Sequence, residues 1–139
     1  MNQFHFTLSS PDAVLFDGVS NSVTLATPNG EISILANHEP LLSLVDPGMM
    51  IIKHDKQEKI LATGGGFVRI SPKLVEVFAQ TAEFVDSIDE KRAIEAKQQA
   101  ESLMKQKTDE VSLADATALL ERNIARLKTI ERHKKRSHR

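Results

Sequence analysis

Three arginines in the second half of the chain have the residue type and spacing to build an anion site. Arg122 and Arg126 are four residues apart, so on a helix they would share one face. Two helices are expected in this half, joined by a turn near Thr108. Positions equidistant from that turn then lie opposite each other, which places Arg92 against the pair. Guanidinium groups form forked hydrogen bonds with phosphate oxygens, so the cluster suits a phosphate-bearing ligand.

Two acidic residues close to this cluster leave its role open. Asp89 lies one helical turn before Arg92, and Glu83 lies in the segment just before the helices. Arginines surrounded by carboxylates also build salt-bridge networks. The same residues therefore predict either an anion site or a network that fixes the helices to the preceding segment.

Catalytic and metal-binding arrangements are absent from the sequence. There is no cysteine, no two histidines have metal-site spacing, and no nucleophile-elbow motif occurs. The run Gly64-Gly65-Gly66 lacks the lysine of a phosphate-binding loop and precedes an expected strand, so it predicts a bulge or a close strand crossing. We therefore predict a chain that is not an enzyme and binds no metal. The histidines are His5, His38, His54, His133 and His138.

The elements that must position the arginines begin at an abrupt change in pattern. Ser87 followed three residues later by Glu90 predicts a capping box at the start of a helix, and Asp89 adds favourable negative charge to its first turn. The pattern predicts helices from Ile88 to about Met104 and from Ser112, with Asp115 as its capping partner, to about His133. The chain thus divides into two expected domains, 1–86 and 87–139.

The first of these segments predicts a β-sandwich. Short alternating runs are separated by turn signals every few residues, with no helical pattern between them. Asn29-Gly30 is a strong hairpin signal. The predicted fold class is α+β: an N-terminal antiparallel β-sandwich followed by a C-terminal antiparallel two-helix hairpin. The expected strands are 4–8, 14–16, 19–27, 31–35, 41–45, 49–53, 59–63, 67–70, 74–79 and 82–85, and the six phenylalanines, all before residue 87, are Phe4, Phe6, Phe16, Phe67, Phe78 and Phe84.

The facing sides of the two helices are rich in alanine. They bury little apolar surface, and Asn123 interrupts the stripe on the second helix, so the hairpin alone is only marginally stable. We expect it to need the sandwich, a ligand or a partner to hold one shape. The predicted seam consists of Ala93, Ala96, Ala100, Leu103 and Met104 facing Leu113, Ala116, Leu120, Asn123, Leu127 and Ile130.

Charge is distributed unevenly. Residues 1–87 hold ten acidic against five basic side chains, and residues 88–139 hold nine against thirteen. The basic C-terminal end predicts an acidic partner surface, nucleic acid, or simply a solvated helix end whose cations suit the helix dipole. Nucleic-acid binding is the weakest of these, because the chain offers no aromatic stacking platform. The N-terminus does not resemble a signal peptide, and no apolar run is long enough to span a bilayer.

Several motifs in order resemble the epsilon-subunit family of bacterial F-type ATP synthases. The segment 27–42 carries the family's hairpin and its following His-x-Pro-Leu loop, although Ser33 replaces the usual glycine. Asp46-Pro47-Gly48, Gly64-Gly65-Gly66-Phe67 and Ile88-Asp89-Glu90-Lys91-Arg92-Ala93 match in order and spacing. The resemblance covers the whole chain.

The resemblance implies a non-catalytic subunit of the central stalk, on the cytoplasmic face of the bacterial membrane and peripheral to it. The sandwich would bind the gamma subunit and the c-ring, with Glu31 and His38 at the end that faces the ring and the adjacent stalk. The hairpin would extend into the catalytic head to inhibit ATP hydrolysis, its basic end meeting the alpha and beta subunits. A solvated-turn role for Glu31 and His38 remains the alternative.

The resemblance also implies ATP as a regulatory ligand rather than a required cofactor. The matching positions are Glu83, Ile88, Asp89, Arg92, Ala93, Arg122 and Arg126. Gln99 stands where that pattern has a further basic residue, which predicts weaker binding. A free-standing nucleotide-responsive module is the alternative function.

Overall fold

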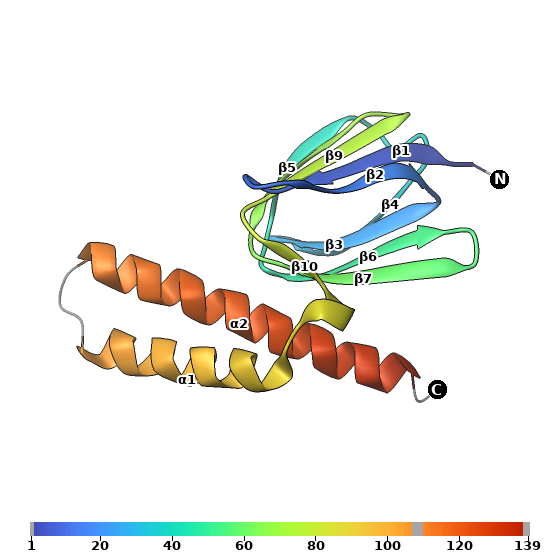
Figure 1. The fold of residues 1–139 in the computed structure, drawn as a ribbon. Helices are drawn as coiled ribbons and strands as arrows, with labels where there is room; N and C mark the ends of the chain where they lie inside the picture. The colour runs from blue at the N-terminus through green and yellow to red at the C-terminus, as the bar shows by residue number, and fades with distance from the viewer. Residues whose placement is uncertain (1, 107–109, 138–139) are drawn as a thin grey trace.

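The chain folds into a β-sandwich with a helical hairpin on one side (Figure 1). The structure is a computed structural model and describes residues 2–106 and 110–137. The strands are β1 (Phe4–Ser9), β2 (Val14–Ser20), β3 (Ser22–Thr27), β4 (Gly30–Leu35), β5 (Leu41–Val45), β6 (Gly48–His54), β7 (Gln57–Thr63), β8 (Gly66–Ile70), β9 (Leu74–Ala79) and β10 (Ala82–Phe84). A short 3-10 turn, η1 (Val85–Ser87), leads to α1 (Glu90–Gln106) and α2 (Glu110–Ser137).

Two five-stranded sheets form the sandwich. One has the order β2-β1-β9-β8-β5 and is called sheet A here; the other, sheet B, has the order β10-β7-β6-β3-β4. All pairings are antiparallel except that of β1 with β9, which is parallel. The predicted fold class is confirmed. The core between the sheets is built from alternate residues of both, and its largest members include Phe6, Leu8, Leu25, Ile34, Met50, Ile52, Leu61 and Ile70.

The predicted boundary between the second and third strands is wrong, whereas the other strand ends lie within two residues of those predicted. Asp17-Gly18 does not end β2, which continues to Ser20 beside β1. The break falls instead at Asn21, whose side-chain Oδ1 accepts a hydrogen bond from the backbone N–H of Asp55 at 2.6 Å. Asn21 thereby joins two turns and separates β2 from β3, whereas the alternating pattern had placed Val19 and Ser20 in one strand with residues 22–27.

The glycine signals behave as predicted. β3 and β4 form the expected hairpin, with Thr27 paired to Gly30, and Gly30 has the positive φ of 116° that favours glycine. At Gly66 the chain passes very close to β9. A Cβ there would overlap the carbonyl oxygen of Phe78 and lie 2.9 Å from the Cα of Ala79. The glycine run thus lies where the start of β8 comes very close to the backbone of β9.

Two of the six phenylalanines lie outside the core. Phe67 and Phe78 are stacked against each other on the outer face of sheet A, with ring centroids 5.0 Å apart. Both are exposed, at 45% and 37%. The alternating pattern assigns Phe67 and Phe78 to one face of their strands. It does not tell whether that face packs into the core or faces solvent.

The helices begin and end at different residues from those predicted. α1 starts at Glu90 rather than Ile88, and α2 starts at Glu110, ahead of the Ser112 that was expected to cap it with Asp115. α2 also continues past His133 to Ser137. The turn that was predicted at Thr108 lies outside the described residues.

The predicted cap of α1 is wrong. Ser87 belongs to η1, and its hydroxyl donates to the carbonyl of Phe84 at 2.8 Å. Asp89 caps the helix instead: its carboxylate accepts a hydrogen bond from the backbone N–H of Arg92 at 3.2 Å. Ile88 has extended backbone and packs against the cluster between sandwich and hairpin, which delays the start of the helix.

Replacing Asp89 by alanine is expected to destabilise the first turn of α1 by about 1 kcal/mol, because one backbone donor loses its partner. Hydrogen exchange of the amides of residues 91–94 should accelerate accordingly. Ser87→Ala is the matched control and should leave these amides unchanged. An equal acceleration in both variants would contradict the assignment of the cap to Asp89.

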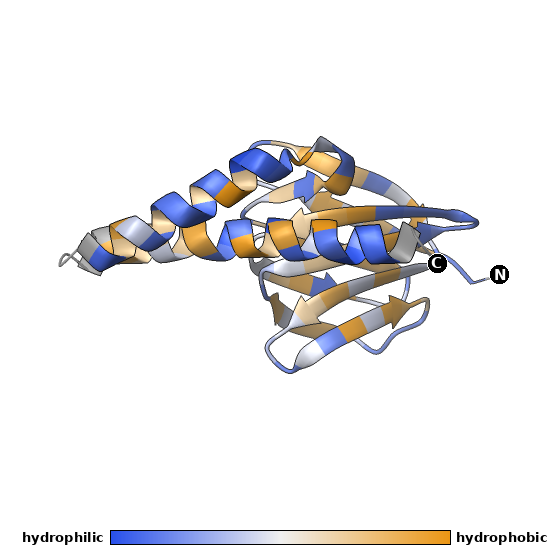
Figure 2. Cartoon of the chain, turned by 90° about the horizontal axis from the view of Figure 1, so that it is seen from below, coloured by the Kyte–Doolittle hydropathy of each residue, from blue (hydrophilic) through white to orange (hydrophobic). Residues whose placement is uncertain are grey.

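The hairpin packs on itself and on sheet B. Between the helices the buried residues Ala93, Ala100 and Ala116 allow close approach. Beneath α2, Ile130 is buried with side chains from β6, β7 and η1, namely Met49, Ile51, Ile60 and Val85. The far end of the hairpin extends beyond the sandwich in both views (Figures 1 and 2), so there the helices support only each other.

Candidate functional site

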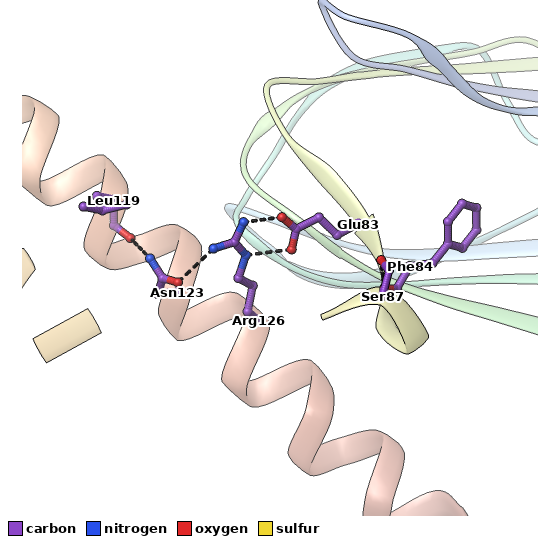
Figure 3. A network of polar contacts seen from close by, with 6 residues as sticks. All are labelled: Glu83, Phe84, Ser87, Leu119, Asn123 and Arg126. Carbon is purple, nitrogen blue, oxygen red and sulfur yellow. Dashed lines mark hydrogen bonds and ion pairs between the residues drawn. The ribbon is translucent and has the colours of Figure 1, made fainter. Parts of the chain in front are cut away.

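A chain of polar contacts ties α2 to the edge strand β10 (Figure 3). The guanidinium of Arg126 forms a forked ion pair with Glu83, in which Nε donates to Oε2 at 2.6 Å and Nη2 to Oε1. Its Nη1 donates to the Oδ1 of the fully buried Asn123 at 2.9 Å. Asn123 in turn donates to the carbonyl of Leu119 at 2.8 Å. Asn123, which interrupts the apolar stripe of the second helix, therefore orients Arg126.

A second ion pair lies at the opposite edge of the same sheet. Arg132 donates through Nη1 to the Oε2 of Glu31 on β4 at 3.1 Å. The first pair is partly buried, with Arg126 and Glu83 21% and 32% exposed, whereas Arg132 and Glu31 are 48% and 46% exposed. The sequence offered no signal for the outer pair, because Arg132 and Glu31 are far apart in the chain.

The structure does not bring the three arginines together as predicted. Arg92 is 86% exposed, and its Nε lies 3.6 Å from the Oδ2 of Asp89. Symmetry about Thr108 would place position 126 opposite Glu90, but Lys134 pairs with Glu90 at 2.9 Å. α2 is much longer than α1 and is positioned by its contacts with sheet B, so the symmetric register does not apply.

Arg122 lies apart from both ion pairs. It is partly buried and, within the described part of the chain, makes no hydrogen bond or ion pair. It lines a hollow of about 580 Å³ between the first half of α2 and one end of the sandwich. The glycine run 64–66 and Thr81 line the same hollow, as do two carboxylates, Asp46 and Glu121.

Three positions of the motif at residues 88–93 have structural roles when the hairpin lies against sheet B. Ile88 packs against the cluster beneath α2, Asp89 caps α1, and Ala93 is buried against the second helix. Gln99 is exposed. Of the sequence-predicted cluster, Glu83 is joined to Arg126 and Asp89 to Arg92. The two pairs do not converge, which is the geometry of the salt-bridge interpretation.

Glu31 and His38 do not share one end of the sandwich. Glu31 lies near the start of β4, whereas His38 lies in the loop after the end of that strand. The Nδ1 of His38 is 2.7 Å from the carbonyl oxygen of Glu39. The loop leads into β5, which borders the apolar face described next.

The outer face of sheet A carries a patch of exposed apolar side chains. Leu44 of β5 pairs with Phe67 of β8, and Phe67 pairs with Phe78 of β9, so the three form a row across the sheet. Leu42 adds to it on β5. Exposure is 69% for Leu42, 65% for Leu44, 45% for Phe67 and 37% for Phe78. A contiguous patch of this kind is typical of a protein interface.

The basic C-terminal end is engaged within the chain. Besides the Arg132–Glu31 pair, Lys134 pairs with Glu90, and Lys135 lies 3.3 Å from Glu131 on its own helix.

No helix in the described residues is long and apolar enough to cross a membrane. Nor do residues 2–106 and 110–137 contain a group of three or more histidine, aspartate or glutamate side chains that could hold a metal ion.

Two family models match consecutive parts of the chain. Residues 3–85 match the β-sandwich domain of the ATP synthase delta/epsilon chain, and residues 86–131 match the long α-helix domain of the same chain. The ATP synthase epsilon chain of Chromobacterium violaceum is 37% identical over 140 residues, covering 99% of this chain and all of the relative. That of Acidithiobacillus ferridurans is 40% identical over 123 residues, covering 88% and 87%.

Solved structures share the fold. A chain in the mitochondrial ATP synthase of Euglena gracilis, an OSCP/F1/c-ring structure, superposes with a TM-score of 0.74 at 22% identity, covering 87% of this chain and 77% of that one. A chain in the central stalk and c-ring of the Tetrahymena thermophila enzyme gives 0.55 at 15% identity, covering 94% and 95%. Because both halves match in order and bacterial relatives match over nearly the full length, the chain belongs to the ATP synthase delta/epsilon chain family, a family of non-catalytic subunits.

Proposed function

We propose that this chain is a central-stalk subunit that couples a membrane rotor ring to the catalytic head of an F-type ATP synthase. The observation that supports this most directly is the difference between the two faces of the sandwich. The outer face of sheet B is partly covered by the chain's own hairpin, whereas that of sheet A bears the patch of Leu42, Leu44, Phe67 and Phe78. The patch is the surface on which we propose that the gamma subunit docks.

The remaining partners are assigned by position. Glu31 is half-exposed near the start of β4, and we assign it to the side that faces the c-ring. His38 lies in the loop leading to β5, next to the apolar patch, and we assign it to the stalk side. The chain is then peripheral, on the cytoplasmic face of the membrane, and acts as part of the rotor.

The hairpin supplies regulation in this proposal. Among the described residues, the part of the hairpin beyond the sandwich is held by an alanine-rich seam, and the contact with sheet B includes one small apolar cluster and two ion pairs. Two states separated by a few kcal/mol can be exchanged by modest differential binding. We propose that the hairpin, residues 87–139, leaves sheet B and extends into the head, where its basic end binds the alpha and beta subunits and inhibits ATP hydrolysis. The sandwich, residues 1–86, remains docked.

Co-purification with the gamma subunit tests the assignment. The full chain should form a stable complex with gamma from the same organism. ATPase rates of the assembled head then test regulation, because a chain that ends after Asp86 should relieve inhibition without loss of assembly. Absence of any complex with gamma would overturn the proposed function, while equal rates with both chains would overturn only the regulatory part.

A second candidate function is nucleotide sensing by the docked hairpin. It is favoured by Arg122, a partly buried cation with no acidic partner within the described residues, one helical turn before Arg126. A phosphate could bind there while the Glu83–Arg126 pair holds the hairpin in place. The carboxylates of Asp46 and Glu121 in the same hollow oppose an anion, as does the absence of a basic residue at Gln99.

If ATP binds to this docked form, millimolar ATP should slow hydrogen exchange in residues 88–106 and 113–133. Arg122→Ala should abolish most of that protection, because it removes the unpaired cation. Arg92→Ala is expected to have a smaller effect, since Arg92 is almost fully exposed. An unchanged exchange pattern at millimolar ATP would exclude the site, and equal losses in both variants would point to a hairpin rearranged around the nucleotide.

A further inference from the structure

The second helix is held at both edges of sheet B. Glu83 lies on β10, the edge strand, and Glu31 lies on β4, the opposite edge strand. Arg126 and Arg132, six residues apart on α2, reach these two acids. Ile130 lies between the arginines in the sequence and is buried against β6 and β7, the strands that α2 crosses.

The two contacts differ in how firmly they are held. Arg126 is oriented by the buried Asn123 and forms a forked pair with Glu83. Arg132 makes one hydrogen bond to Glu31, and both side chains are about half exposed. Exposed ion pairs are weak and open easily. The inner pair therefore fixes the position of α2, and the outer pair is the one that a partner can reach.

We propose that these pairs form a two-point latch and that its outer point couples the hairpin to the partner at the Glu31 edge. Glu31 binds either Arg132 or a cationic side chain of the docked ring. A second cation at Glu31 would lie beside the Arg132 guanidinium, and like charges repel, so the two compete. The coupling rests on the proposed function, which assigns Glu31 to the c-ring side.

Competition of this kind acts in both directions. A cationic ring surface that engages Glu31 frees Arg132 and weakens the hold of the sheet on the end of α2. Conversely, removal of Arg132 must strengthen binding of the ring, because the two binding events are thermodynamically linked. The basic end of the hairpin would then become available once the chain is seated on its partner.

Binding of the full chain to a purified assembly of c-ring and gamma subunit tests the coupling. Arg132→Gln should bind this assembly about three- to fivefold more tightly than the unmodified chain, the range expected for release of an exposed ion pair. Lys135→Gln is the matched control, because it removes the same charge from the same helix but Lys135 pairs with Glu131 of α2 itself. Its affinity should remain within about twofold of the unmodified chain.

A double-mutant cycle gives the decisive result. In the Glu31→Gln background, Arg132→Gln should no longer change affinity for the assembly. A gain that persists without Glu31, or no gain from Arg132→Gln alone, would overturn the coupling.

Hydrogen exchange of the free chain tests the latch separately. Glu31→Gln and Arg132→Gln should each accelerate exchange in residues 128–135 and leave β6 and β7 protected, which also reports that the sandwich remains folded. Unchanged exchange in α2 would overturn the latch. If the unmodified chain does not bind the assembly at all, the proposed function and the coupling both fail, while the exchange data still decide the latch.

Discussion

Phe67→Asp is expected to weaken binding of the gamma subunit by at least about 100-fold, corresponding to roughly 3 kcal/mol. Phe67 is at the centre of the apolar row on sheet A, between Leu44 and the stacked ring of Phe78. Interface hot spots cluster near the centre of a patch and are often large aromatic side chains. An aspartate there would be desolvated without a partner. Because Phe67 is 45% exposed in the free chain, the substitution should leave the sandwich folded.

The measurement is a titration of gamma with the purified chain, alongside a urea unfolding curve of each variant. Leu44→Asp should lower affinity in the same direction. Leu35→Asp is the matched control for it, since Leu35 is another exposed leucine, at 59% against 65%, but lies on β4 of sheet B. If Leu35→Asp weakens gamma binding as much as Leu44→Asp, or if Phe67→Asp binds normally, the patch is not the docking surface.

Gly66→Ala is expected to destabilise the sandwich by about 3 kcal/mol, near the upper range for overpacking. The added methyl group would overlap the carbonyl oxygen of Phe78 and press on the Cα of Ala79. Both are backbone atoms of β9, so no side-chain rotation can relieve the clash. β8 and β9 would have to separate where Gly66 pairs with Ala79, and β9 also carries the pairing with β1.

Urea unfolding of the full chain, with hydrogen exchange to localise the change, measures this effect. Exchange should increase first in β8 and β9. Gly18→Ala is the control, because a Cβ there would meet only the ring of Phe16 at 3.6 Å, an ordinary contact, and its cost should be within about 0.5 kcal/mol. Comparable destabilisation by the two substitutions would show that the crowding at Gly66 is not responsible.

Local signals in the sequence determined much of the fold. Alternation of apolar and polar residues, the Asn29-Gly30 turn and the change to helical spacing after residue 86 predicted a sandwich followed by a hairpin, as found. These signals work because each acts over a few residues, through side-chain direction and turn conformation. They failed where a distant contact decided the outcome. Asn21 separates two strands through its hydrogen bond to Asp55, and Ile88 delays α1 because it packs on the sandwich.

The candidate site depended more heavily on such distant contacts. The sequence identified Glu83, Arg122 and Arg126 as a polar group near the boundary between the sandwich and the hairpin. It also indicated that Asn123 was unusual, because this residue interrupts the apolar stripe. It could not supply the register between the helices, because that register follows from where α2 lies on sheet B rather than from the length of the connection. Arg92 consequently points to solvent, and Arg132 pairs with Glu31 across most of the chain.

Residue types and their spacing thus determined which elements form and which side chains carry charge. Only the tertiary structure decided which charges meet and which apolar face remains uncovered. The physical reason is that ion pairs and interface patches depend on the relative placement of whole elements, which is set by the sum of many packing contacts. The three arginines show this most clearly. Arg126 is paired with Glu83, Arg92 is exposed beside Asp89, and Arg122 lines a hollow with no partner in the described part of the chain.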